Sequence, residues 1–65
     1  MFLVFYKTSD VFDSEEILQS SNISVEVVPT PVQDKAYCGV CLQTNHSNKL
    51  LCENLLREKD LKILE

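Results

Sequence analysis

The alternation of apolar and polar residues along the first half of the chain predicts a strand, a helix and a second strand. Residues 2–7 are an unbroken apolar and aromatic run up to a terminal lysine, which is typical of a buried strand. Residues 10–21 place apolar side chains at helical spacing among acidic ones, and Thr8 and Ser9 before them offer N-cap side chains. Residues 23–28 alternate between apolar and polar types, as half-buried strands do.

The second half of the chain predicts a loop followed by a strand, a helix and a strand. The loop covers residues 29–36 and begins with a Pro-Thr-Pro sequence, which ends the preceding strand. Residues 37–43 have the pattern of a third strand, residues 44–59 that of a second helix, and residues 61–64 that of a last strand. The predicted order of elements is therefore βαββαβ.

This order predicts an α+β domain with the ferredoxin-like fold. Right-handed crossovers put the third strand between the first and the second, and the fourth outside the first, in a four-stranded antiparallel sheet with both helices on one face. The end of the first strand, the start of the first helix and the loop before the third strand then meet at one edge of the sheet. Cys38, the second residue of the third strand, is expected at that edge.

Length and charge limit the classes of function. The 65 residues suffice for a single domain spanning residues 1–65, and 45% apolar with 25% charged residues is typical of a folded chain. Six basic and ten acidic residues give a net charge of −4, which argues against nucleic acid or an anionic membrane as a ligand. The apolar opening is too short for a membrane helix or a signal peptide. Three cysteines, an odd number, fit a reducing compartment, so we expect a cytoplasmic protein.

Two segments carry a resemblance to a known family. They are Pro29-Thr30-Pro31 and, six residues later, Cys38-Gly39-Val40-Cys41-Leu42, behind an aromatic first strand that runs into Thr8-Ser9. With these segments the chain resembles, over nearly its whole length, the putative Se/S carrier protein-like family of small bacterial domains. The resemblance implies that Cys38 carries a persulfide or perselenide between a donor and an acceptor protein, without a cofactor and without enzymatic activity. Val32 stands where that family commonly has an arginine.

The expected site surrounds the Cys38 thiol. Backbone N–H groups at the start of the first helix, beside Thr8 and Ser9, point toward the neighbourhood of Cys38, as they do where a helix stabilises an anion. Gly39 leaves room for a close approach by another molecule. The other residues expected to line the site come from the preceding loop: Pro29, Pro31 and Lys35. The charged residues expected at this edge are Asp10, Asp13, Asp34, Lys7 and Lys35.

Other uses of the cysteines stay open. In a regular strand Cys38 and Cys41 point to opposite faces with Cα atoms about 10 Å apart, beyond the ~7 Å limit for a disulfide, but a bulge at Gly39 would reverse this. A C-x2-C-x4-H-x5-C spacing also suggests a zinc module with the ligands Cys38, Cys41, His46 and Cys52. Where zinc knuckles have glycines and basic residues, this segment has Leu-Gln-Thr-Asn and a leucine-rich helix. Alternatively, the domain is a non-catalytic protein interaction module in which the cysteines only pack.

The alternation of the strands also predicts an assembly. The side chains expected to face the helices are Leu3, Phe5, Val40, Leu42, Leu61 and Ile63. Those expected on the open face of the sheet are Phe2, Val4, Tyr6, Cys41 and Leu64. A contiguous apolar patch of this kind marks an interaction surface. We therefore expect a homodimer, or a tight heteromeric partner, packed through the open sheet face, with Cys41 buried in the contact and Cys38 free.

Overall fold

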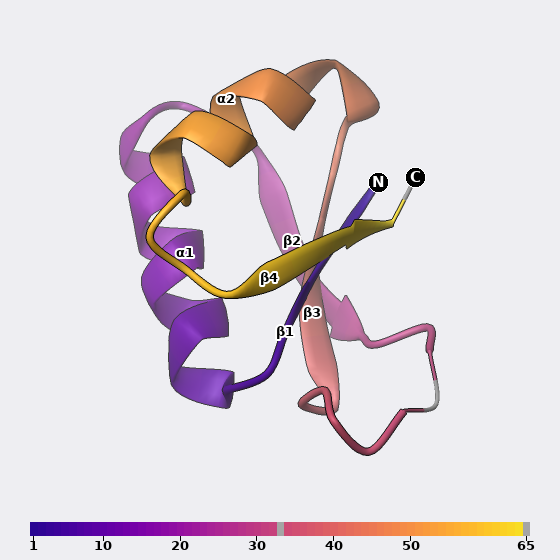
Figure 1. Ribbon diagram of the computed structural model, residues 1–65. Coiled ribbons are helices and arrows are strands. Elements are labelled where there is room, and N and C mark those ends of the chain that lie inside the picture. Colours follow the sequence, from indigo (N-terminus) through magenta and orange to yellow (C-terminus); the bar gives the residue numbers. More distant parts are fainter. Residues whose placement is uncertain (33, 65) are drawn as a thin grey trace.

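A four-stranded antiparallel sheet with two helices on one face forms the framework of the molecule (Figure 1). The computed structural model describes residues 1–32 and 34–64. The elements, in chain order, are β1 (Phe2–Phe5), α1 (Thr8–Ser20), β2 (Val25–Pro29), β3 (Val40–Thr44), the 3₁₀-helix η1 (His46–Asn48), α2 (Lys49–Leu55) and β4 (Leu61–Leu64). The predicted α+β class is confirmed. Among the described residues, no helix is long and apolar enough to cross a membrane.

The strands lie in the order β2-β3-β1-β4, so that β3 is the neighbour of both β2 and β1, and β4 lies outside β1. These are the neighbours that the sequence predicts. The register pairs Leu3 of β1 with Leu42 and Ile63 on either side, and Leu42 in turn with Val27. One apolar row therefore crosses all four strands on the same face, because paired residues in a sheet point the same way.

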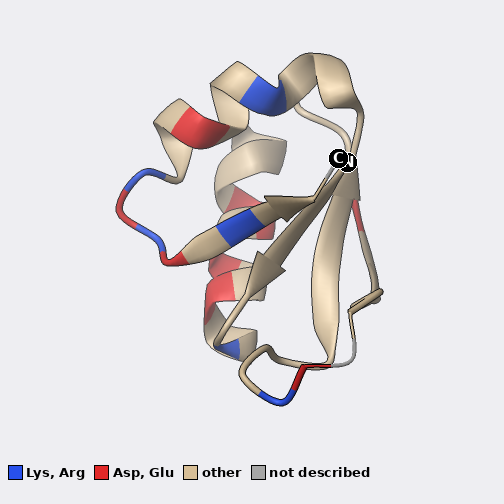
Figure 2. Cartoon of the chain, turned by 45° about the vertical axis from the view of Figure 1, so that its right-hand side comes forward, with Lys and Arg blue, Asp and Glu red and all other residues tan. Residues whose placement is uncertain are grey.

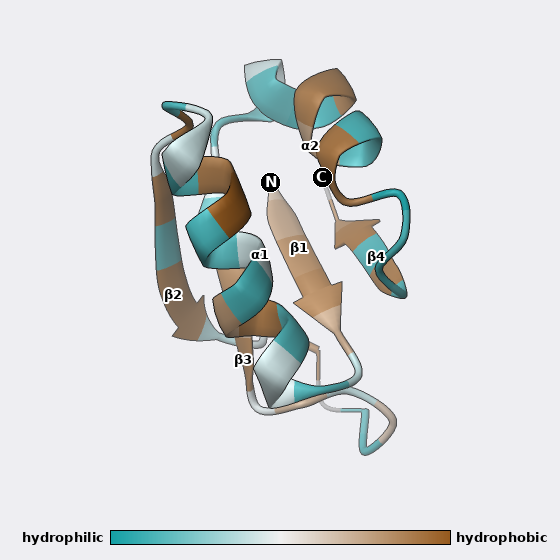
Figure 3. Cartoon of the chain, turned by 90° about the vertical axis from the view of Figure 1, so that its left-hand side faces the viewer, coloured by the Kyte–Doolittle hydropathy of each residue, from teal (hydrophilic) through white to brown (hydrophobic). Residues whose placement is uncertain are grey.

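That row faces the helices and forms the core. The buried cluster consists of Leu3, Phe5, Val11, Leu18, Ile23, Leu42, Cys52 and Leu56. Val40, Leu61 and Ile63 pack against it from the sheet, so all six side chains predicted to face the helices do so. Figure 3 shows apolar segments of α1 and α2 on this side of the sheet. Alternation along each strand was sufficient to identify this face.

The first helix begins and ends differently from the prediction. Its N-cap is Lys7, with extended backbone (φ −123°, ψ 135°) and no side-chain hydrogen bond to the cap among the described residues. Thr8 and Ser9 thus belong to the first turn of α1 and are not caps. At the other end, Asn22 has a φ of 62°, and the Ile23 N–H donates to the Leu18 carbonyl over 2.9 Å. This is a Schellman ending, in which asparagine tolerates the left-handed conformation.

Several predicted boundaries are wrong for the second half. Residue 29 ends β2 and is not the first loop residue, and the third strand begins at residue 40 instead of 37. The predicted helix over 44–59 is a 3₁₀ turn followed by a short α-helix that ends at Leu55. Asn45 starts the turn, since its side-chain Oδ1 accepts from the Ser47 N–H over 3.1 Å.

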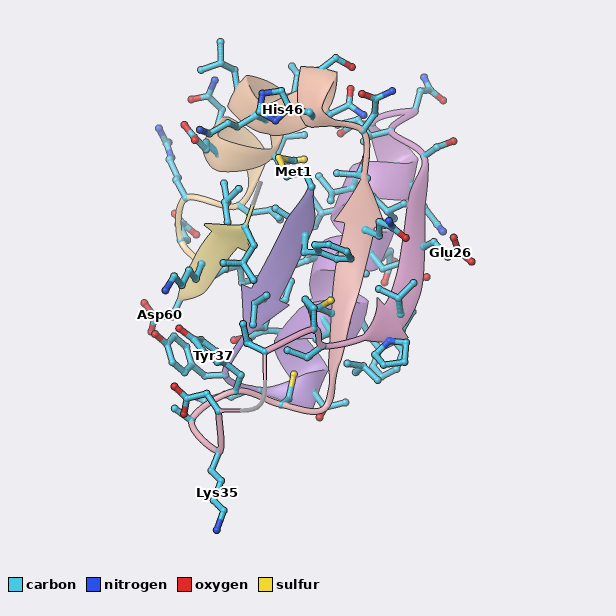
Figure 4. All side chains as sticks on the ribbon, turned by 90° about the vertical axis from the view of Figure 1, so that its right-hand side faces the viewer. Met1, Glu26, Lys35, Tyr37, His46 and Asp60 are labelled. Carbon is cyan, nitrogen blue, oxygen red and sulfur yellow. The ribbon has the colours of Figure 1, made fainter. Side chains whose placement is uncertain are left out.

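The open face of the sheet differs most from the expectation. Val4 and Cys41 are paired across β1 and β3 on this face, yet each has 0% of its surface exposed. The chain after β2 passes across this side of the sheet, opposite the helices (Figures 1 and 4). Phe2 and Leu64 are half-buried, and Tyr6 is 49% exposed. The expected contiguous apolar patch is thus interrupted, and the burial of Cys41 does not require a second molecule.

We expect Val4→Glu to destabilise the monomer strongly. A carboxylate at a fully buried position without a partner is left uncompensated, and we expect a loss of about 3 kcal/mol or more in the free energy of unfolding. Urea denaturation followed by circular dichroism measures the loss. Lys62→Glu is the matched control, because Lys62 is paired with Val4 but exposed. Equal stability of the two variants would contradict the burial of Val4 by its own chain.

We expect Ser14→Ala to stabilise the protein. Ser14 lies in α1 with 0% exposure, and its Oγ has no hydrogen-bond partner among the described residues. Removing a buried, unsatisfied hydroxyl in favour of a better helix former is expected to add about 1 kcal/mol to the free energy of unfolding. Ser20→Ala, at an exposed position of the same helix, controls for helix propensity. A smaller gain for Ser14→Ala than for Ser20→Ala would show that the hydroxyl is satisfied.

Candidate functional site

Backbone hydrogen bonds on both sides fix Cys38 just before β3. Its N–H donates to the carbonyl of Phe5, the last residue of β1, over 3.0 Å. Its carbonyl accepts from the Thr30 Oγ1 hydroxyl over 2.8 Å. Because α1 begins three residues after Phe5, Cys38 lies at the end of the sheet where this helix starts. The predicted edge is therefore correct, although Cys38 precedes the strand that was expected to contain it.

The chain leaves the regular sheet between Cys38 and β3. The pairing of β1 with β3 ends at Val4 and Cys41. If the register continued, Phe5 would pair with Val40, but its carbonyl accepts from Cys38 instead. The Cys38 Sγ donates to the carbonyl of Val40 over 3.0 Å, which closes this irregular segment on itself. The Cys38 side chain is half-buried and packs against the edge of the core.

A surface pocket of about 340 Å³ contains Cys38. Its lining residues are Thr30, Val32, Asp34, Lys35, Tyr37, Cys38 and Gly39. Two of the residues expected around the thiol, Gly39 and Lys35, therefore line the same pocket. The Lys35 side chain extends away from the body of the protein (Figure 4). Val32 contributes an apolar side chain to this lining.

The other expected lining residues lie outside this pocket as far as the described part of the chain shows. Pro29 and Pro31 flank Thr30, which lines the pocket in their place. Thr8 and Ser9 are in the first turn of α1. Sequence reasoning missed Thr30 as a contact of Cys38. The signal was available, because in Pro-Thr-Pro only the middle residue has an N–H and a hydroxyl to donate.

The two other cysteines are buried. All three thiols are free. Burial raises the pKa of Cys41, although a hydrogen bond with Thr30 opposes this, and burial likewise raises the pKa of Cys52. Cys52 is on α2 and belongs to the buried core cluster. A thiol must be reachable and deprotonated to act as a nucleophile, so neither buried cysteine competes well with Cys38.

Two acidic residues of α1 form ion pairs with Lys59. Figure 2 shows acidic positions along this helix. The Lys59 Nζ lies 3.7 Å from the Asp10 Oδ1 and 3.6 Å from the Asp13 Oδ2. Of the acids expected at the edge, Asp34 is the one that lines the pocket, and its Oδ1 accepts from the Ala36 N–H over 2.9 Å. The charge near Cys38 is therefore set mainly by the loop and less by the helix.

An aromatic pair flanks the pocket. The rings of Tyr6 and Tyr37 stack with centroids 5.0 Å apart and planes at 28°. A side-chain hydrogen bond with Tyr37 raises the pKa of Tyr6 above its usual 10.0. Tyr37 is on the loop and Tyr6 follows β1, so the pair joins the loop to the sheet.

The zinc alternative is not supported by the geometry. Within residues 1–32 and 34–64, no group of three or more histidine, cysteine or acidic side chains is arranged to hold a metal ion. The four residues with the zinc-like spacing are dispersed among three elements and the segment before β3. His46 opens η1 at the far end of β3 from Cys38.

The sequence matches the model of a protein family. The family model described as "Putative Se/S carrier protein-like" matches residues 1–65, the full length of the sequence. No curated protein and no solved structure gave a match. The match confirms the resemblance that the Pro-Thr-Pro and Cys-Gly segments indicated.

We expect Tyr37→Phe to lower the pKa of Tyr6. The substitution keeps the stacked ring but removes the hydroxyl whose hydrogen bond raises this pKa. Because the folded-state pKa of Tyr6 exceeds its unfolded value, the contact stabilises the fold below about pH 10 and is lost as the pH rises through the folded pKa. NMR titration of ¹³C-labelled tyrosine measures the pKa of Tyr6 in both proteins. An unchanged Tyr6 pKa in Tyr37→Phe would contradict the hydrogen bond.

Proposed function

The chain belongs to the Putative Se/S carrier protein-like family, and on that premise we propose that its Cys38 carries sulfur or selenium as a persulfide or perselenide. Donor and acceptor proteins load and unload it. The domain itself is not an enzyme and needs no cofactor, since the transferred atom is its cargo. We also assign the ferredoxin-like fold, supported by the strand order β2-β3-β1-β4, and a cytoplasmic location, supported by the odd number of cysteines.

The unequal exposure of the three cysteines carries this proposal. Cys38 is half-buried at a surface pocket, whereas Cys41 and Cys52 are fully enclosed. A carrier requires one reachable thiol whose position is fixed, and two backbone hydrogen bonds fix Cys38. The buried thiols have pKa values raised by burial, which keeps them protonated and inert near neutral pH.

The transfer is a thiol exchange at sulfur. The Cys38 thiol first gives up its proton, and with it the hydrogen bond to the Val40 carbonyl. The thiolate then attacks the outer sulfur of a donor persulfide. An S–S bond forms at the Cys38 Sγ, the bond to the donor's inner sulfur breaks, and the donor leaves as a thiolate. Delivery to an acceptor thiolate is the reverse step, so no external oxidant or reductant is consumed.

One observation favours a second candidate, a non-catalytic interaction domain. Three leucines of α2 are exposed, Leu50 to 73%, Leu51 to 53% and Leu55 to 40%. Apolar side chains gathered on one short helix are typical of a protein contact surface. A carrier also contacts proteins, so the exposed leucines alone do not separate the two candidates. The behaviour of Cys38 toward sulfur does.

Loading with inorganic polysulfide tests the carrier. We expect the protein, treated with sodium tetrasulfide and freed from excess reagent, to gain about 32 Da on the Cys38 peptide in mass spectrometry. A thiolate attack leaves trisulfide behind, so the reaction balances without an oxidant. Cys38→Ser should abolish the gain, whereas Cys41→Ser and Cys52→Ser, at buried positions, should retain it.

Alkylation with iodoacetamide provides the second arm of this test. Cys38 should react first in the folded protein, because the other two thiols are enclosed. Equal labelling of all three cysteines, or sulfur addition only after unfolding, would exclude the carrier and leave the interaction domain.

A further inference from the structure

The backbone at Gly39 does not require glycine. Its φ is not in the left-handed region, where glycine is favoured. A Cβ built on Gly39 would meet no heavy atom of the described residues within 4 Å. The residue is exposed, and its carbonyl is fixed by the Thr30 N–H over 3.1 Å. Alanine would therefore fit the fold.

Glycine at such a position weakens the fold. It loses more backbone entropy on folding than any other residue, so alanine at the same place is expected to be at least as stable. Gly39 directly follows Cys38 and lines the same pocket. Its missing side chain leaves open space next to the proposed carrier thiol.

The residues around this space favour a protein as the molecule that approaches it. Tyr37 lines the pocket, and its stacking partner Tyr6 is 49% exposed. Aromatic side chains with an exposed apolar face are enriched in protein interfaces. A small sulfur compound can reach a half-buried thiol past a methyl group. A sulfur attached to a folded protein brings a main chain with it, which must come within van der Waals distance of the residues beside Cys38.

We propose that Gly39 determines specificity by admitting the main chain of a sulfur-bearing partner protein beside Cys38. This inference rests on the proposed carrier function and names its substrate class as protein-bound sulfur. A side chain at residue 39 would hold the partner's sulfur away from the Cys38 Sγ while leaving small reagents free to react.

Two disulfide probes of different size test this proposal. The small probe is the mixed disulfide of 2-mercaptoethanol and 5-thio-2-nitrobenzoate. The large probe carries the same 5-thio-2-nitrobenzoate group on a single-cysteine ubiquitin, with that cysteine within a β-strand. In both probes, the Cys38 thiolate attacks the sulfur of 2-mercaptoethanol or of the ubiquitin cysteine. A new S–S bond forms there, the probe's own S–S bond breaks, and coloured 5-thio-2-nitrobenzoate leaves as a thiolate.

Gly39→Ala and Gly39→Val are compared with wild type. We expect rates with the small probe to stay within about twofold, while the rate with the large probe falls about tenfold or more in Gly39→Val and less in Gly39→Ala. Ala36→Val is the matched control, because residue 36 is exposed on the same loop but is not among the residues that line the pocket. Urea denaturation should find Gly39→Ala at least as stable as wild type.

Equal slowing with both probes, or no slowing with the large one, would overturn the role of Gly39. Unfolding of Gly39→Ala would do the same, because glycine would then serve the fold. These outcomes leave polysulfide loading of wild-type Cys38 unaffected, so the carrier function would stand. Conversely, failure of that loading removes the carrier function whatever the two probes report.

Discussion

The hydrogen bond from the Cys38 N–H to the Phe5 carbonyl is the constraint on which the rest of the site depends. It replaces the pairing of Phe5 with Val40 that a regular ladder would make, and so it ends the contact of β1 with β3. Such a bond contributes only about 1 kcal/mol net, but leaving either buried group unpaired costs about 1–3 kcal/mol. This hydrogen bond therefore holds Cys38 against the end of the sheet.

Both faces of the sheet carry buried residues, although the chain has only 65 residues. The helices bury one face, and nothing in the order of elements assigns a cover to the other. The described residues between β2 and β3 lie on this side, where Thr30 donates hydrogen bonds to the main-chain carbonyls of Cys38 and Gly39 (Figure 4). Thr30, whose proline neighbours lack N–H groups, supplies both of these hydrogen bonds, and the Tyr6–Tyr37 stack also joins the loop to the sheet. Thr30 also hydrogen-bonds with Cys41, and both Val4 and Cys41 on this face are buried.

The helix-facing side of the sheet could be predicted from the sequence, because it depends on local periodicity alone. Leu3 and Leu42 follow from alternation along a strand, whatever the loops do. The burial of Val4 could not be predicted, since it requires the path of a loop that is set by bonds between distant residues. The N-cap at Lys7 was also missed. The residue types favoured Thr8 and Ser9 as caps, but the backbone enters the helix one residue before Thr8. The Cys-Gly pair was identified by resemblance, and its contact with Thr30 only by structure.

The alternation that fixes the core has a chemical consequence for the cysteines. Cys38 packs at the edge of the core, whereas Cys41 is paired with Val4 on the opposite face of the sheet. A second thiol within reach of a persulfide attacks its inner sulfur, expels hydrosulfide and leaves a disulfide. Burial encloses Cys41 and raises its pKa, which removes both the access and the thiolate that this attack needs. Cys41, three residues after Cys38, is therefore expected not to attack a sulfur atom held on Cys38, because burial encloses its thiol and keeps it protonated near neutral pH.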